Sequence, residues 1–262
     1  DQNRNSMSEK LHITLVQADL EWNNPEANRQ HLKRLLNKTN ETDIIVLPEL
    51  FTTAFCMEGV AEEMMGESMQ WMHALAQEKK AAVCGSLIIE ENGKRFNRFI
   101  WMSPDGVVEH YDKSHLFSLL SEEEQFAAGK ERQIITYKGW KICPQICYDL
   151  RFPVFSRNDS GYDLLMYVAN WPERRIVAWD KLLQARAIEN QSYVIGVNRV
   201  GADASDVLFT GHSAVYDAFG ETITLLGEQE KVKTVVLEKV KQDEIRAKLP
   251  FLKDGDDFTL SK

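Results

Sequence analysis

The sequence predicts an α/β protein in which two β-sheets pack on each other and helices cover both outer faces, a four-layer α/β/β/α sandwich. Three observations support this fold class. Apolar runs typical of buried strands occur in two sets, one in each half of the chain. Helix-like runs recur at similar places in the two sets. Residues 82–111 carry three successive strand-like runs with no helix between them, which excludes a plain alternation of strand and helix.

The first half of the chain is expected to open with a strand followed by an amphipathic helix. This helix follows Asn24 and Pro25 and carries Leu32, Leu35 and Leu36 at helical spacing among charged residues. A second helix is expected over residues 61–80, where we interpret the methionines as adaptable core packing. Strands are expected at residues 12–18, 44–47, 82–89, 97–102 and 107–111.

The second half is expected to contain a charged loop at residues 121–124 and a helix over residues 174–191, with Pro172 ending the strand before that helix. Strands are expected at residues 133–137, 140–146, 163–168, 193–197, 212–216, 222–225 and 232–237. No repeat or linker divides the chain. We therefore expect a single domain over residues 7–262, and we interpret residues 1–6 as a remnant of an expression vector.

Composition and charge narrow the possible partners. The net charge of −9 argues against nucleic acid or an anionic membrane surface as a partner, because no basic face is present to displace counterions. No apolar run approaches the roughly 20 residues that a membrane-spanning helix needs. The sequence therefore predicts a soluble, cytoplasmic protein. Four cysteines in 262 residues are too few for a disulfide framework, so we expect all of them to be reduced.

Three predicted strands end in reactive side chains. Residues 43–48 lead to Glu49, residues 107–112 lead to Lys113, and residues 140–146 lead to Cys147. A thiol that attacks a carbonyl needs a base to take its proton and a cation to stabilise the charge that develops on oxygen. Glu49, Lys113 and Cys147 can supply these three roles. The alternative is that Cys147 is a small buried hydrophobic residue, as most free cysteines are.

The segments VLPELF at 46–51, YDKSHLF at 111–117 and ICYDLRFP at 146–153 together resemble the motifs of the nitrilase, or carbon–nitrogen hydrolase, superfamily. This resemblance implies the four-layer sandwich, no cofactor, and commonly a homodimer. It also implies that Cys147 attacks an amide carbonyl, that Glu49 transfers the proton, and that Lys113 and the Tyr148 backbone N–H stabilise the oxyanion.

The segments CYDLRFP at 147–153 and VANWP at 168–172 are similar to the bacterial ω-amidase branch, which implies 2-oxoglutaramate or 2-oxosuccinamate as the substrate. The family also implies a second active-site glutamate, seven residues before a glycine that follows the lysine loop. Counting back from Gly129 gives Glu122, with Glu123 and Glu124 beside it, and Ala128 replaces the usual proline. The alternative for Glu122 is a solvated loop charge.

Several residues could bind the rest of the substrate. Arg151 is a candidate for a distal carboxylate, because guanidinium offers a bidentate fork, although a salt bridge with Asp149 is an equal alternative. Trp171, Arg174 and Arg175 follow a strand end on the same expected rim, and either arginine could take the carboxylate instead. Phe55 and His115 could line the pocket, and packing explains them equally well.

Two other classes of function fit the sequence less well. A metal site using Cys143, Cys147, His110 and His115 is disfavoured, because residues four apart on a strand lie about 13 Å apart, too far to share zinc. No Gly-x-Ser-x-Gly motif occurs, which argues against a serine hydrolase. Two alternatives stay open. One is another amidase of the same superfamily, of the N-carbamoyl or deaminated glutathione type, and the other is a non-catalytic scaffold with the same fold.

Overall fold

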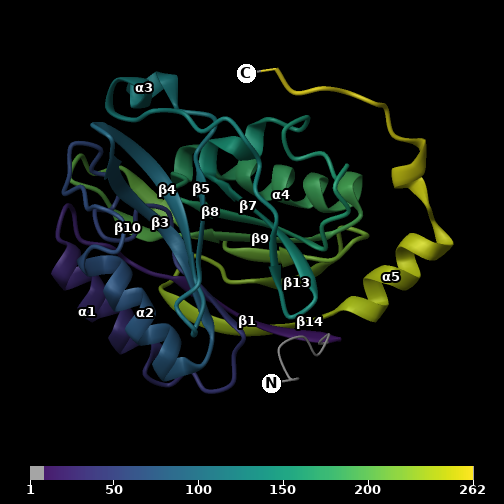
Figure 1. Cartoon of the computed structure of the whole chain (residues 1–262), viewed down its shortest axis with the longest axis horizontal. Helices are drawn as coiled ribbons and strands as arrows, with labels where there is room; N and C mark the ends of the chain where they lie inside the picture. Colours follow the sequence, from purple (N-terminus) through teal and green to yellow (C-terminus); the bar gives the residue numbers. More distant parts are fainter. Residues whose placement is uncertain (1–8, 262) are drawn as a thin grey trace.

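The computed structural model describes residues 9–261 (Figure 1). The interpretation of residues 1–6 as a vector remnant lies outside the described residues. The longer helices are α1 (Pro25–Leu36), α2 (Glu67–Lys79), α4 (Ile176–Asn190) and α5 (Lys239–Lys248). Short helices are α3 (Glu122–Gln125), η1 (Ser118–Leu120), η2 (Cys147–Arg151), η3 (Glu173–Arg175) and η4 (Phe251–Asp254). None of the helices within residues 9–261 is long and apolar enough to cross a membrane.

The first sheet has the strand order β14-β1-β2-β3-β4-β5. Its strands are β1 (Lys10–Gln17), β2 (Ile44–Val46), β3 (Ala82–Glu91), β4 (Lys94–Met102), β5 (Val108–Asp112) and β14 (Lys231–Glu238). The three adjacent strands β1, β2 and β3 are parallel, whereas β14, β4 and β5 pair antiparallel with their neighbours. Parallel strands direct their carboxyl ends to one edge, and Glu49 follows β2 at that edge.

The second sheet has the strand order β13-β12-β9-β8-β7-β6. Its strands are β6 (Ile135–Tyr137), β7 (Trp140–Ile146), β8 (Leu164–Ala169), β9 (Tyr193–Asn198), β12 (Ala214–Tyr216) and β13 (Thr222–Leu225). Strands β7, β8 and β9 are parallel, and the outer strands are antiparallel. A separate hairpin pairs β10 (Val200–Ala202) with β11 (Leu208–Thr210).

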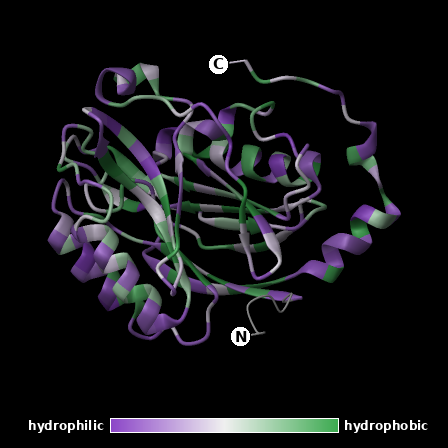
Figure 2. Ribbon diagram, viewed as in Figure 1, coloured by the Kyte–Doolittle hydropathy of each residue, from purple (hydrophilic) through white to green (hydrophobic). Residues whose placement is uncertain are grey.

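The core lies in layers. One apolar cluster fills the space between the sheets and joins Leu15 and Trp101 of the first sheet to Ile142 and Met166 of the second. Another cluster packs α1 and α2 on the outer face of the first sheet, while α4 packs on β9 and β12 of the second. Figure 2 shows the hydrophobic residues concentrated on the central strands. This arrangement confirms the predicted four-layer α/β/β/α sandwich.

Three local expectations differ from the structure. The second helix begins at Glu67 instead of residue 61, because the Glu62 backbone pairs with β3 through hydrogen bonds to Ile88 and Glu90 and is therefore extended. The expected charged loop at 121–124 contains the short helix α3. The hairpin β10–β11 was not predicted, because its two strands are only three residues long and carry little periodicity.

Candidate active site

The structure brings Glu49, Lys113 and Cys147 together between the two sheets. Glu49 lies three residues beyond β2, Lys113 directly follows β5, and Cys147 directly follows β7. The Lys113 ammonium donates to Glu49 Oε1 over 2.9 Å, and both side chains are fully buried. The Cys147 thiol interacts with Glu49 and with the charge of Lys113. A base, a cation and a nucleophile therefore share one site.

A second carboxylate, that of Glu122, also accepts hydrogen bonds from the Lys113 ammonium. Lys113 Nζ lies 2.9 Å from each oxygen of Glu122, and the Phe117 backbone N–H donates to Glu122 Oε2 over 2.6 Å. Glu122 is buried, whereas its neighbours Glu123 and Glu124 are exposed. The geometry therefore favours Glu122 over both neighbours and disfavours its interpretation as a solvated loop charge.

Gly129 brings the loop that carries Glu122 back against the strand end at Lys113. Its N–H donates to the Lys113 carbonyl over 2.9 Å, and an added Cβ would lie 2.0 Å from the Asp112 carbonyl oxygen. Only glycine permits this close approach of two backbones. The loop is therefore anchored directly to the residue that carries the ammonium.

Two asparagines that sequence reasoning missed orient Glu49. Asn97 Nδ2 donates to Glu49 Oε1 over 2.9 Å, and the Asn170 backbone N–H donates to Glu49 Oε2 over 2.9 Å. The Cys147 thiol in turn faces the Asn170 carbonyl at 3.8 Å. Asn170 belongs to the VANWP segment, which could have suggested it, whereas nothing in the local sequence distinguishes Asn97.

Burial and charge set the protonation states. Burial, followed by the negative charge of Glu49, raises the pKa of the Cys147 thiol well above its usual range, although Lys113 opposes this rise. Burial disfavours charge on Lys113, but Glu122 and Glu49 outweigh that effect and raise its pKa. Burial also raises the pKa of Glu122. The resting site therefore favours a protonated thiol and a charged lysine, so the thiol needs a base when it attacks.

Cys147 occupies a strained turn at the end of β7. Its φ of +45° lies in the left-handed region, which costs a residue with a Cβ of the order of 1 kcal/mol. The turn continues as the 3₁₀ helix Cys147–Arg151. The first N–H groups of a helix lack partners within it, so the Tyr148 N–H is suited to an oxyanion.

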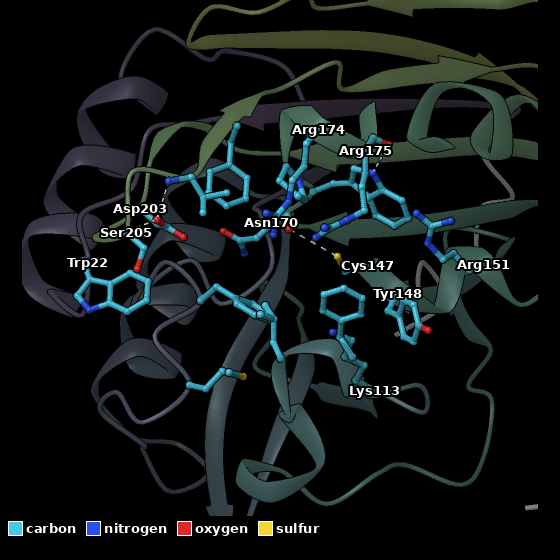
Figure 3. A pocket seen from close by; sticks show the side chains of 18 residues that line it. Trp22, Lys113, Cys147, Tyr148, Arg151, Asn170, Arg174, Arg175, Asp203 and Ser205 are labelled. Atoms are coloured by element: carbon cyan, nitrogen blue, oxygen red, sulfur yellow. Dashed lines mark hydrogen bonds between the residues drawn. The ribbon is translucent and has the colours of Figure 1, made fainter. Parts of the chain in front are cut away.

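A cavity of about 300 Å³ opens above the thiol. Of the residues considered from the sequence, Phe55, Lys113, Cys147, Tyr148, Arg151, Trp171, Arg174 and Arg175 line it. Figure 3 places Cys147 between Tyr148 and Asn170, with Trp22, Asp203 and Ser205 at one end. Sequence reasoning missed that end, because Asp203 and Ser205 belong to the unpredicted β10–β11 hairpin.

His115 is not among the residues that line this cavity, and its contacts are those of the packing alternative. Its ring stacks on Phe152 at a centroid distance of 3.8 Å, and Nδ1 lies 2.7 Å from Asp149 Oδ1. The alternative salt bridge between Arg151 and Asp149 is also absent from residues 9–261, because the Asp149 carboxylate bonds elsewhere. Arg151 instead lies over the Trp171 ring, 4.9 Å from its centroid.

Three arginines on the cavity wall have no carboxylate partner within the described part of the chain: Arg151, Arg174 and Arg175. The Arg175 guanidinium lies 5.0 Å from the centroid of the Phe117 ring. Burial, followed by the charge of Arg174, lowers the pKa of Arg175. Asp203 lines the same cavity but is not within salt-bridge distance of these arginines, and cations gathered in this way favour an anionic ligand.

Within residues 9–261, no group of three or more His, Cys, Asp and Glu side chains could hold a metal ion. Cys143 is buried and faces Gln145, and burial raises the pKa of its thiol to about 12. All four cysteines are free, as the sequence predicts. The chemistry that the site offers is that of a thiol with a carboxylate and an ammonium.

A buried thiol, carboxylate and ammonium at strand ends of a four-layer sandwich define a class of hydrolases that cleave carbon–nitrogen bonds through cysteine. The chain belongs to the carbon-nitrogen hydrolase family, whose sequence model matches residues 12–247. It is 42% identical to the omega-amidase YafV of Escherichia coli strain K12, with 95% of this chain and 98% of that protein aligned.

Two further relatives extend the comparison. The 2-oxoglutaramate amidase of Bacillus subtilis is 30% identical, with 94% of this chain and 97% of that protein aligned. The crystal structure of XC1258 from Xanthomonas campestris, a CN-hydrolase superfamily protein with an arsenic adduct in its active site, matches with a TM-score of 0.94 at 42% identity. That match covers 96% of this chain and 99% of XC1258.

Proposed function

We propose that this protein is an ω-amidase that hydrolyses the terminal amide of 2-oxoglutaramate, or of the shorter 2-oxosuccinamate, to the 2-oxo acid and ammonia. The observation that carries the proposal is the set of unpaired arginines on the wall of a cavity that holds Cys147 at its base. A dicarboxylic monoamide has an anionic carboxylate a few carbons from its scissile amide. The names of the Escherichia coli and Bacillus subtilis relatives support the same substrate class.

In the proposed mechanism, Glu49 takes the proton of the Cys147 thiol as sulfur attacks the amide carbon. The developing oxyanion is stabilised by Lys113 and by the Tyr148 N–H. The tetrahedral intermediate collapses, the C–N bond breaks, and Glu49 returns the proton to the departing ammonia. Water, activated by Glu49, then attacks the thioester and releases the acid and the free thiol. Glu122 holds Lys113 in place throughout.

The substrate experiment compares ammonia release from 2-oxoglutaramate with release from butyramide, a simple aliphatic amide. Removing the arginine that binds the carboxylate should lower kcat/KM for 2-oxoglutaramate roughly 10- to 150-fold, because a hydrogen bond to a charged group contributes about 1.5–3 kcal/mol. The loss for butyramide should be smaller. Alanine variants of Arg151, Arg174 and Arg175 identify the residue responsible, with the exposed Lys181 on α4 changed to alanine as a control.

Equal turnover of the two amides, or no change in their ratio in any arginine variant, would contradict the carboxylate anchor. A nitrile or an N-carbamoyl or deaminated glutathione substrate would then be preferred. A non-catalytic scaffold would release no ammonia from any amide, and iodoacetamide would then label Cys147 no faster than Cys56, Cys84 or Cys143. The same assay series therefore separates the proposed activity from each alternative.

We also propose that residues 7–262 form a single domain and that the protein is a cytoplasmic homodimer. After α5 the chain continues toward the C-terminus (Figure 1), and it carries apolar side chains such as Phe251, which is 58% exposed. The segment 249–252 could bury these side chains against a second copy. Light scattering at micromolar concentration should give the mass of a dimer, and Phe251→Asp should weaken it while Val107→Asp should not.

A further inference from the structure

Asp149 is a fully buried carboxylate that the proposed chemistry does not use. It lies two residues beyond Cys147, and it is not among the residues that line the cavity. An ionised carboxylate in such a position is costly unless donors surround it. Its donors are the Tyr111 hydroxyl at 2.8 Å, the Ile146 N–H at 2.9 Å, the His115 N–H at 3.0 Å and His115 Nδ1 at 2.7 Å.

These donors come from both sheets. Tyr111 and His115 flank Lys113 at the end of β5, in the first sheet, whereas Ile146 directly precedes Cys147 at the end of β7, in the second. No backbone ladder joins the two sheets within the described residues. The relative position of Lys113 and Cys147 therefore depends on side chains that cross between the sheets. Asp149 makes that crossing with three hydrogen bonds, from the Tyr111 hydroxyl, the His115 N–H and His115 Nδ1, while the fourth, from the Ile146 N–H, lies within the second-sheet segment.

The same carboxylate supports the turn that exposes the thiol. Its Oδ2 accepts the Ile146 N–H and so closes a short loop around Cys147, whose φ is +45°. A residue that carries a Cβ adopts this left-handed backbone conformation only when surrounding contacts stabilise it. Oδ2 also accepts the proton of the Tyr111 hydroxyl, and the hydroxyl oxygen in turn accepts the Ser114 N–H at 3.1 Å. Burial raises the pKa of Tyr111, so this hydroxyl keeps its proton.

We propose that Asp149, held by Tyr111 and His115, is a positioning residue that fixes the Cys147 sulfur and the Tyr148 N–H relative to the Lys113 ammonium. Asp149 does not touch the substrate. It acts by keeping the two halves of the oxyanion site, one on each sheet, at the separation that the transition state requires. Displacement of a reacting group by about 1 Å can cost on the order of 100-fold in rate.

Asp149→Asn tests this role. Asparagine has the same size as aspartate, but its NH₂ group replaces one of the two accepting oxygens and therefore faces at least one hydrogen-bond donor. We expect kcat for 2-oxoglutaramate to fall about 100-fold, with KM changed less than about threefold, because the arginines that bind the substrate are untouched. Tyr111→Phe removes a single donor and should lower kcat about tenfold with the same small change in KM.

Asp163→Asn is a matched control. Asp163 is also a buried carboxylate that accepts a backbone N–H, from Lys141, but it lies at the opposite end of β7 from Cys147. It should lower the thermal midpoint while leaving kcat of the folded enzyme unchanged. Tyr162→Phe, which removes another buried hydroxyl bonded to the Ser156 carbonyl, is the corresponding control for Tyr111→Phe.

The kinetic readout rests on the proposed amidase function, so wild-type ammonia release is measured first. If the wild type is inactive, the proposed function fails, and the rate of Cys147 alkylation by iodoacetamide then serves as the readout for Asp149. A change in that rate for Asp149→Asn, absent in Asp163→Asn, supports the positioning role. Wild-type kcat or alkylation in Asp149→Asn, or a loss that appears mainly in KM, overturns it. If Asp149→Asn does not fold, the same criteria apply to Tyr111→Phe.

Discussion

Replacement of Glu122 by glutamine probes the lysine at the centre of the site. In the wild type, both Glu122 oxygens lie 2.9 Å from Lys113 Nζ, and Oε2 also accepts the Phe117 N–H. Glutamine has only one oxygen, so its NH₂ group faces the ammonium in either orientation, and when it replaces Oε2 it also faces the Phe117 N–H. Each of these contacts sets donor against donor. The variant therefore loses at least one hydrogen bond between charged groups.

A hydrogen bond to a charged group contributes about 1.5–3 kcal/mol, and each 1.4 kcal/mol corresponds to about tenfold in rate. If that energy holds Lys113 against the oxyanion, kcat should fall roughly 10- to 150-fold. The pH profile should change as well. Glu122 raises the pKa of Lys113 more than any other charged group, so its removal should lower that pKa. Because the lysine must stay charged, activity should be lost at a lower alkaline pH in the variant.

The assay is ammonia release from 2-oxoglutaramate across a range of pH, with Glu123→Gln and Glu124→Gln as controls. Both control residues occupy the same short helix but are exposed, so their variants should match the wild type. Wild-type kcat with an unshifted alkaline limit in Glu122→Gln would refute this role of Glu122, and so would a control variant that lost as much activity as Glu122→Gln.

Three further predictions concern the nucleophile and its cation. Cys147→Ala should abolish ammonia release while the circular dichroism spectrum is retained, and more than trace turnover would exclude a Cys147 thioester. Lys113→Met should lower kcat on the order of 100- to 1000-fold, as loss of one oxyanion donor does, and near wild-type turnover in the folded variant would dismiss that role. Burial, followed by the charge of Glu49, raises the pKa of the Cys147 thiol, so the rate of its alkylation by iodoacetamide should still increase beyond pH 9.0. A plateau near neutral pH would contradict this protonation state.

Local patterns in the sequence predict the elements that carry the site. Apolar runs at 44–47 and 140–146 have few alternating polar residues, which is typical of strands buried on both faces, and both are central strands in the structure. The four-layer sandwich followed from the two sets of such strands and from the family resemblance. The same motifs predicted Glu49, Lys113 and Cys147 as one group, and the spacing from Gly129 selected Glu122.

Contacts between distant elements could not be predicted in this way. Asn170 bonds to Glu49 across 121 residues, and Asp149 bonds to Tyr111 across 38 residues, although nothing in either local pattern indicates the partner. His115 appeared suited to the pocket because it is close to Lys113 in sequence. In the structure its ring stacks on Phe152, and His115 is not among the residues that line the cavity.

The sequence by itself determined the strands of the two six-stranded sheets, their order along the chain and the reactive side chains at their ends, because periodicity and composition report how each segment is buried. Only the tertiary structure decided which strand ends meet, which arginines lack a carboxylate partner within residues 9–261, and that the β10–β11 hairpin closes one end of the cavity. The physical reason is that these features depend on how two sheets pack face to face. No backbone ladder connects those sheets within the described residues, so side chains such as Asp149 set their alignment.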